Sequence, residues 1–277
     1  MQEDGSYALE LLSKYIRLAG YRSDTMVQKN FAFSSVSHNQ IKDHCDQQDK
    51  SFSNGQIITG GDEQDVDFED DDGKCEVAKI DGKKYQSDWI IIRYHGNDDG
   101  SMADCFGSNT IKGNIIDDQQ TIVNAFFIRE DDEDEIAKAN EDKGKDKYKT
   151  FSLFCERKIF DKDMQEIKPT RTEAFARGIE GMQIQYGVNN SGDPTKGVQA
   201  YLNANNVVNW NTVISVKVAL LVRSDINIAD KEQPYIFPPW DDEKNSITPS
   251  TGDFRLRHVF TTTINLRNQS QALSPLD

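Results

Sequence analysis

The sequence predicts an α+β fold in which one amphipathic helix near the N-terminus packs on an antiparallel β-sheet with long loop insertions. Apolar residues recur at helical spacing in the opening segment. Further along, six short runs alternate apolar with polar residues or are continuously apolar, as strands do. Long polar loops join these runs in place of crossover helices, so we expect antiparallel pairing.

The helix is predicted from Gly5 to Ala19, and Gly20 is its stop signal. Its opposite face carries Glu10 and Lys14, which are spaced to pair one turn apart. We expect the centre of the apolar stripe to pack on the sheet, and this centre consists of Ala8, Leu12, Tyr15 and Ala19.

The apolar arc covers about half of the helix, which is wider than one sheet face usually needs. We therefore predict that a flank stays partly exposed and meets partner helices. The flanking pairs are Leu9 with Ile16 and Leu11 with Leu18, and Leu9 and Ile16 are the candidate interface. The alternative is that the whole arc packs in the core.

Strands are expected at six places, and the segments between them are expected to be loops. The runs cover residues 89–94, 121–129, 151–155, 182–186, 214–222 and 260–266. Residues 22–87 look irregular and polar, and long excursions follow at 130–147, 187–209 and 224–253. No internal repeat or linker divides the chain, so residues 22–277 are expected to form one elaborated β-rich domain behind the helix.

The acidic net charge of the chain argues against nucleic acid as a partner. The chain has 277 residues, 47 of them acidic and 32 basic, and its formal net charge is −15. Such a field repels phosphate backbones and anionic lipid, so we expect no direct binding of nucleic acid.

Four cysteines point to an oxidising compartment. They are Cys45, Cys75, Cys105 and Cys155, and no two are close enough for a redox or zinc motif. Their even number and wide spacing favour two disulfides over four buried thiols. Three connectivities are possible, and we favour Cys45–Cys75 with Cys105–Cys155.

Disulfides without an export signal need an explanation. The sequence shows no signal peptide, and its longest apolar run, Val218–Val222, is too short to span a bilayer. The helix also begins without a clear N-cap, as the lower end of a longer helix would. We therefore expect that Met1 is an engineered start and that an export segment has been removed. The alternative is an intact protein with a simple N-terminal helix.

Motifs for catalysis and metal binding are missing from the sequence. It has no nucleophile elbow, HExxH, P-loop or dinucleotide fingerprint, and its four histidines are scattered. The acidic run DFEDDDG at Asp67–Gly73 fits part of a calcium loop but fails at both strong ligand positions. We expect no enzyme activity and no cofactor, with an irregular calcium site as the alternative.

Six segments together resemble the PilW family of type IV pilus minor pilins. They are the helix at 6–21, SDWIIIRYHG with the following DCFG, FSLFCER, RGIEGMQIQYGV, WNTVISVKVALLVRS and RLRHVFTTTINLRN. They follow the family's order from Gly5 to Asn268. In this resemblance DCFG carries the first paired cysteine and FSLFCER its partner. The family's prepilin-peptidase site and membrane-spanning half-helix have no counterpart in this sequence.

The resemblance implies a structural role in pilus assembly. Residues 1–21 would be the lower half of the N-terminal pilin helix and residues 22–277 the pilin head. Such a protein is held in the inner membrane with a periplasmic head and then moves to the extracellular pilus tip. Its implied partners are other minor pilins, the major pilin and a tip adhesin, with roles in adhesion or twitching motility. Two alternatives are a large minor pseudopilin of type II secretion and a secreted β-rich binding or hydrolytic domain. A calcium-dependent adhesive module is a third.

Overall fold

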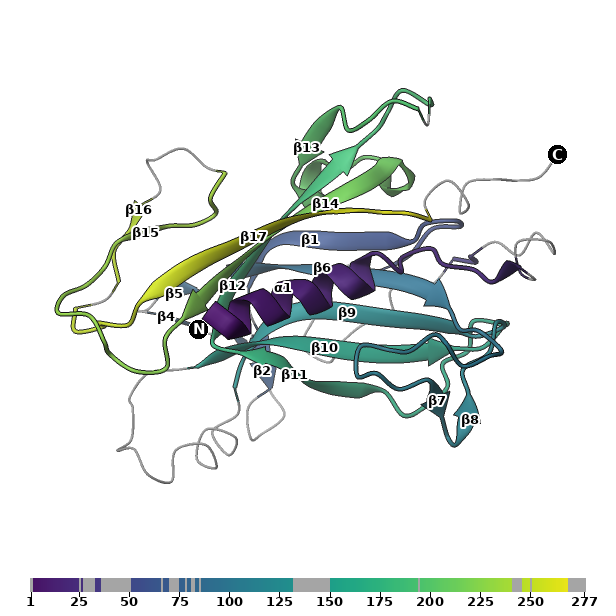
Figure 1. Ribbon diagram of the computed structural model, residues 1–277, viewed down its shortest axis with the longest axis horizontal. Helices are drawn as coiled ribbons and strands as arrows, with labels where there is room; N and C mark the ends of the chain where they lie inside the picture. The colour runs from purple at the N-terminus through teal and green to yellow at the C-terminus, as the bar shows by residue number, and fades with distance from the viewer. Residues whose placement is uncertain are drawn as a thin grey trace.

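In the described residues of this computed structural model, one α-helix packs with two larger antiparallel sheets, which confirms the predicted α+β class (Figure 1). The described residues are 2–24, 26, 33–35, 51–65, 67–69, 75–77, 79–80, 83–84, 86–131, 150–193, 195–240, 246–249 and 251–268. For the residues among these that lie between 63 and 84, and for residue 246, only the backbone is described. No helix in these ranges is both long and apolar enough to cross a membrane.

The first sheet has five strands in the order β1-β6-β9-β10-β11. Their bounds are β1 Ile58–Asp65, β6 Gln86–His95, β9 Thr121–Glu130, β10 Phe151–Phe160 and β11 Arg171–Arg177. All pairs are antiparallel. The sheet is buried on both faces at its centre, which explains why β6 is almost continuously apolar where it reads WIII.

The second sheet has four strands in the order β13-β12-β14-β17. They are β12 Ile179–Val188, β13 Ala200–Leu202, β14 Val213–Arg223 and β17 Arg257–Asn265. In β12 and β14 the residues that alternate toward the first sheet are fully apolar, which matches the period-two pattern of the sequence.

The loops between these strands contain short hairpins and 3-10 turns. The hairpins are β2 Asp67–Glu69 with β3 Cys75–Val77, β4 Lys79–Ile80 with β5 Lys83–Lys84, β7 Thr110–Ile111 with β8 Asn114–Ile115, and β15 Tyr235–Ile236 with β16 Ser246–Ile247. Two 3-10 turns, η1 Ala204–Asn206 and η2 Trp210–Thr212, precede β14.

Helix α1, Gln2–Ile16, fills the space between the two sheets. The sheets approach each other where β12 faces β6, and α1 contacts β17 and β14 of the second sheet and β11 of the first. Its close approach to β17 depends on Gly5, because a Cβ there would lie 2.5 Å from the Phe260 ring. The helix therefore closes the open side of a two-sheet wedge (Figure 1), where one sheet was expected.

Strand β1 was missed in the sequence because its glycine pair reads as a loop signal. A Cβ on Gly60 would lie 1.8 Å from the Tyr186 hydroxyl oxygen, and one on Gly61 would lie 2.3 Å from Trp89 Nε1. The glycines therefore allow β1 to approach both side chains closely. The expectation of an irregular segment from residue 22 to 87 is wrong at this strand.

Segments on the outer face of the first sheet cover a second, smaller apolar cluster. Its buried members are Phe52, Trp89, Ile91, Val123, Ala125 and Phe160. Beside it, the guanidinium of Arg93 lies 5.0 Å from the ring centroid of Phe33 and 4.6 Å from that of Phe52. This guanidinium donates to the backbone oxygens of Gln56, Ser34 and Ser53. Arg93 thereby holds two parts of the long excursion after α1 against β6.

Candidate functional site

The inward face of α1 carries the four residues that the sequence placed at the centre of the stripe. Ala8, Leu12, Tyr15 and Ala19 are all buried in the main core cluster. The Tyr15 ring lies 6.2 Å from the ring of Phe126 in β9 and 6.2 Å from that of Phe175 in β11. These aromatic contacts attach the second half of the helix to the first sheet.

The candidate interface at Leu9 and Ile16 is wrong in its premise of exposure. Leu9 is 9% exposed and Ile16 is 0% exposed, and both belong to the same core cluster as Leu12. The physical reason is the wedge. A helix between two sheets buries a wider arc than a helix lying on one face, so the flank with Leu9 and Ile16 is core.

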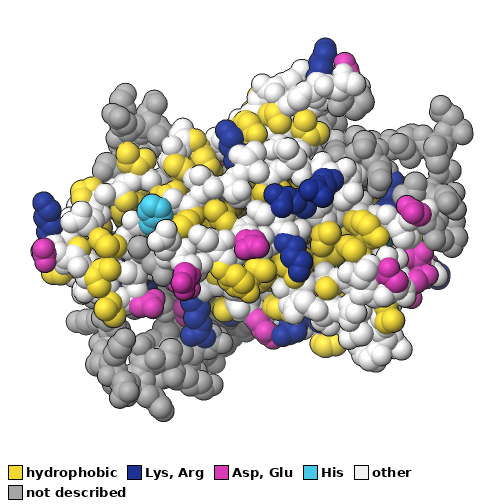
Figure 2. Space-filling model, in the orientation of Figure 1, with side chains coloured by type: hydrophobic (Ala, Val, Ile, Leu, Met, Phe, Trp, Pro, Cys, Tyr) yellow, Lys and Arg dark blue, Asp and Glu magenta, His cyan; other side chains and the backbone are white. Residues whose placement is uncertain are grey.

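The outward face of α1 lies on the other side of the stripe. Tyr7 is 55% exposed, Lys14 is exposed, and Leu11 and Leu18 are partly buried. Spacings of four and three residues place Tyr7, Leu11 and Lys14 in one row along the helix, and Leu18 follows four residues later in the turn after Ile16. Figure 2 views the molecule from the side of α1 and shows apolar and charged side chains interspersed over this face. The row is thus an accessible, mixed apolar and basic surface, which we call the outward row.

The end of α1 is fixed to both sheets. The side-chain amide of Asn268, just after β17, donates to the backbone oxygens of Arg17 and Ala19 at 3.4 and 3.2 Å. The Gly20 amide donates to the Arg93 oxygen at 2.9 Å. Gly20 has φ of +77°, which only glycine adopts without strain. These contacts satisfy carbonyls at the helix end and hold the outward row in a fixed orientation.

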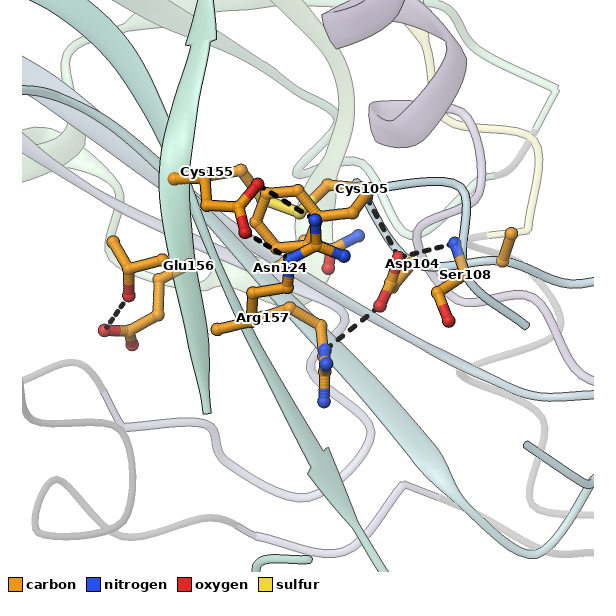
Figure 3. Close-up of a disulfide and its surroundings, with 12 residues drawn as sticks. Asp104, Cys105, Ser108, Asn124, Cys155, Glu156 and Arg157 are labelled. Carbon is orange, nitrogen blue, oxygen red and sulfur yellow. Dashed lines mark hydrogen bonds and ion pairs between the residues drawn. A yellow bond between two sulfur atoms is a disulfide. The ribbon is translucent and has the colours of Figure 1, made fainter. Parts of the chain in front are cut away.

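A disulfide joins Cys105 and Cys155, the pairing favoured from the sequence (Figure 3). Cys155 lies at the centre of β10, and Cys105 lies in the loop that follows β6. Both residues are buried. Of the other predicted pair, Cys45 lies outside the described residues and the side chain of Cys75 is not described, so that pairing stays a prediction.

An ion pair lies directly beside this disulfide. Arg157 Nε lies 3.0 Å from Asp104 Oδ2, and both side chains are almost fully buried (Figure 3). Asp104 Oδ1 also accepts hydrogen bonds from the amides of Phe106 and Ser108, both at 2.9 Å. One carboxylate therefore shapes the cysteine loop and attaches it to β10, in parallel with the covalent bond.

The cysteine loop also reaches α1. Burial is the main cause that raises the pKa of Tyr15, and the charge of Asp104 adds to it. The neighbouring Tyr94 hydroxyl donates to the Ala103 oxygen at 2.7 Å and accepts from Asn124 Nδ2 at 2.9 Å. Burial likewise raises the pKa of Tyr94. These tyrosines stay neutral and serve as hydrogen-bonding and packing groups.

The histidines and the acidic run are the remaining candidates for catalysis or metal binding. In the described part of the chain, no three His, Cys, Asp or Glu side chains gather in a way that could hold a metal ion. His95 is buried and stacked 4.4 Å from the Phe33 ring, and burial lowers its pKa to about 4. His258 is exposed on β17 beside Phe260. The residues of the acidic calcium-like run have no described side chains, and His38 and His44 lie outside the described ranges.

Two residues that fix this geometry were missed in the sequence. Arg93 reads as a polar residue within a buried strand, and its burial among backbone carbonyls lowers its pKa to about 9. Asn268 has no signal beyond its place after the last strand. A charged residue inside an otherwise continuous apolar run is the cue that could have identified Arg93.

Comparison with known proteins gives a family match over part of the chain. Residues 138–268 match the family model of PilW, described as type IV pilus-assembly protein W, and this range contains β10 to β17. No curated protein matches. A solved structure, the type IV-like pilin TTHA1219 from Thermus thermophilus, aligns over 97% of each chain with a TM-score of 0.44 and 10% identity. A likeness at that level supports no functional argument. The family match confirms the predicted resemblance: residues 138–268 are similar to the PilW family of type IV pilus-assembly proteins.

Proposed function

We propose that this protein is a structural minor pilin of the type IV pilus, which primes pilus assembly at the tip together with other minor pilins. The observation that carries the proposal is the PilW match over residues 138–268. That range includes β14 and β17, the strands of the second sheet that α1 contacts. The matched segment thus supplies much of the surface that the helix contacts, including β11 of the first sheet.

In this proposal residues 1–21 are the lower half of a pilin helix and residues 22–277 are the head. The head is periplasmic while the protein is held at the inner membrane, and extracellular once it is in the pilus. The disulfide between Cys105 and Cys155 suits both of these oxidising surroundings. The other minor pilins, the major pilin and a tip adhesin are the proposed partners.

The contact with neighbouring pilins is assigned to the outward row of α1 rather than to Leu9 and Ile16. Tyr7, Leu11 and Leu18 offer apolar area on a helix whose orientation is fixed at Gly20 and Asn268. Lys14 adds a positive charge to a chain whose net charge is −15. A partner helix with an apolar stripe and an acidic margin would complement this row.

A deletion strain of the source organism tests the proposal. We expect the strain to lose surface pili and the wild-type gene to restore them. A Leu11→Asp variant should restore few pili although the protein folds, because a charge buried in a helix–helix contact costs several kcal/mol. The matched control is Val208→Asp, at a residue that is 99% exposed, which should restore pili fully. Normal piliation in the deletion strain would contradict the proposal, and loss of protein secretion in place of pili would indicate the pseudopilin.

A further inference from the structure

Strand β17 lies at the end of the second sheet, and its outward backbone groups can be assigned from the register. Leu266 donates its amide to the Ile214 oxygen, and Ser224 donates to the Leu256 oxygen. In an antiparallel ladder, hydrogen-bonded pairs alternate with pairs that do not bond to each other. The even-numbered residues of β17 therefore bond to β14, and the odd-numbered residues direct their N–H and C=O groups away from it.

Arg257 begins the strand, and its side chain pairs with Glu180. Beyond it, the outward set consists of Val259, Thr261, Thr263 and Asn265. Among the residues that the structure describes, no backbone group pairs with these eight donors and acceptors. Val259 is partly exposed and the other three residues are exposed. The pairing with β14 runs over nine residues without a bulge. Within the described residues, the edge is therefore straight and open over four pairing positions.

In natural proteins, proline, charged side chains or a bulge usually keep an exposed sheet edge from pairing with another chain. Residues 258–265 read HVFTTTIN, with no proline, lysine, acidic residue or glycine. The run is also rich in β-branched residues, which favour strand pairing. An edge that lacks these protections is suited to accept another strand.

A groove lies beside the same positions. It has a volume of about 440 Å³ and is lined by Lys217, Pro239, Trp240, Thr261, Thr262 and Thr263. Thr261 and Thr263 share the face of the sheet on which Lys217 stands, because Lys217 is paired with Thr263. Side chains of an added strand that lie opposite Thr261 or Thr263 would point to that same face. The groove is therefore placed to receive one of them.

We propose that the open edge of β17 accepts an extended segment of a partner protein as an added strand, with an apolar or aromatic side chain in the groove beside Trp240. Backbone hydrogen bonds would supply the affinity and the groove the selectivity, as in other strand-addition complexes. The net charge of −15 disfavours a second copy of this chain and favours a neutral or basic segment. The proposal does not depend on the pilus assignment, since it stands on the edge geometry alone.

The experiment uses the whole chain and a synthetic probe. The probe is a capped nine-residue peptide with a lysine at each end, threonines on one face, and two valines around a central phenylalanine on the other. Amide hydrogen exchange is followed residue by residue by NMR. We expect saturating peptide to slow exchange at Val259, Thr261, Thr263 and Asn265 at least about tenfold. Exchange of the even-numbered amides should be slow in both states.

Two matched comparisons separate strand addition from other binding. N-methylation of the peptide amides that face one way should abolish binding, and N-methylation of those that face the other way should leave it unchanged. Thr261→Pro removes one outward N–H without touching the ladder to β14, and it should weaken binding about tenfold. Thr261→Val keeps that N–H and should bind like the wild type.

Three results would overturn the proposal. The first is unchanged exchange at the four outward amides with peptide at millimolar concentration. The second is equal binding of the two N-methylated peptides, which can be measured even if the proline variant does not fold. The third is protection of the same amides in the free protein that grows with protein concentration, because the occupant would then be a second copy of the chain.

Discussion

The wedge position of α1 makes neighbouring leucines respond differently to the same substitution. Leu12 is 0% exposed and lies between the sheets, whereas Leu11 is only partly buried. Leu12→Ala removes the equivalent of three buried methylene groups, about 2.5 kcal/mol of transfer free energy, and leaves a cavity that adds about 1 kcal/mol. Leu11→Ala loses roughly half of the transfer term and leaves no closed cavity, so it should cost about 1 kcal/mol.

Both substitutions replace the same residue type in the same helix, so helix propensity cancels in the comparison. For a chain of this size, about 3.5 kcal/mol corresponds to a fall in Tm of roughly 10 °C, and about 1 kcal/mol to roughly 3 °C. Thermal melts and urea unfolding under non-reducing conditions measure both quantities. Ile16→Ala should group with Leu12→Ala, because Ile16 is also core. Equal losses at Leu11 and Leu12, or a negligible loss at Ile16, would refute the wedge.

Three further predictions concern the groups that fix the loops to the sheets. Replacing Cys105 and Cys155 by serine should lower the free energy of unfolding by up to about 4 kcal/mol, because the bond closes a loop with a sequence separation of 50. In that serine variant, Arg157→Met should lower the free energy of unfolding more than it does in the oxidised protein. His95 has a pKa of about 4 in the folded protein and about 6.5 in the unfolded chain. The free energy of unfolding should therefore fall by about 3 kcal/mol as the pH drops from 6.5 to 4. His95→Gln should remove this dependence of stability on pH. Arg93→Lys should destabilise by about 2–4 kcal/mol, because an ammonium cannot serve three carbonyls spread around a planar guanidinium.

Each of these has a result that contradicts it. Equal costs of Arg157→Met in the oxidised and serine forms would show that the ion pair and the disulfide act independently. A pH slope that persists in His95→Gln, or that also disappears in a control His258→Gln variant, would mean that other groups cause it. Near-wild-type stability of Arg93→Lys would show that the carbonyl contacts do not hold the excursion.

Period-two patterning predicted the long strands because each buries at least one face. β6, β9, β10, β12 and β14 contain the segments expected from their alternating or continuous apolar residues, and β17 contains all of 260–266 except Leu266. β11 was missed because it is an edge strand with mostly half-buried residues, so RTEAFAR shows no clear alternation. The number of sheets could not be predicted from the sequence either. The alternation of apolar and polar residues shows which face of a strand is buried, but not which strand it pairs with.

In the candidate site, too, local sequence predicted some residues, whereas the roles of others depend on distant segments of the chain. The inward stripe followed from the spacing of Ala8, Leu12, Tyr15 and Ala19 alone. Leu9 and Ile16 were misplaced because their burial depends on a second sheet built from residues about 170 positions or more further along the chain. The roles of Arg93 and Asn268 depend on backbone atoms of distant segments, for which no sequence pattern exists.

The location of the protein tests the central claim most directly. Pili sheared from the source organism, washed and digested, can be analysed by quantitative mass spectrometry for peptides of this chain. We expect the chain to be present in the filament fraction at a small fraction of the amount of the major pilin, and to disappear from this fraction in the Leu11→Asp strain. Its absence from filaments that assemble in normal number, with the protein abundant elsewhere in the cell, would contradict its assignment as a minor pilin.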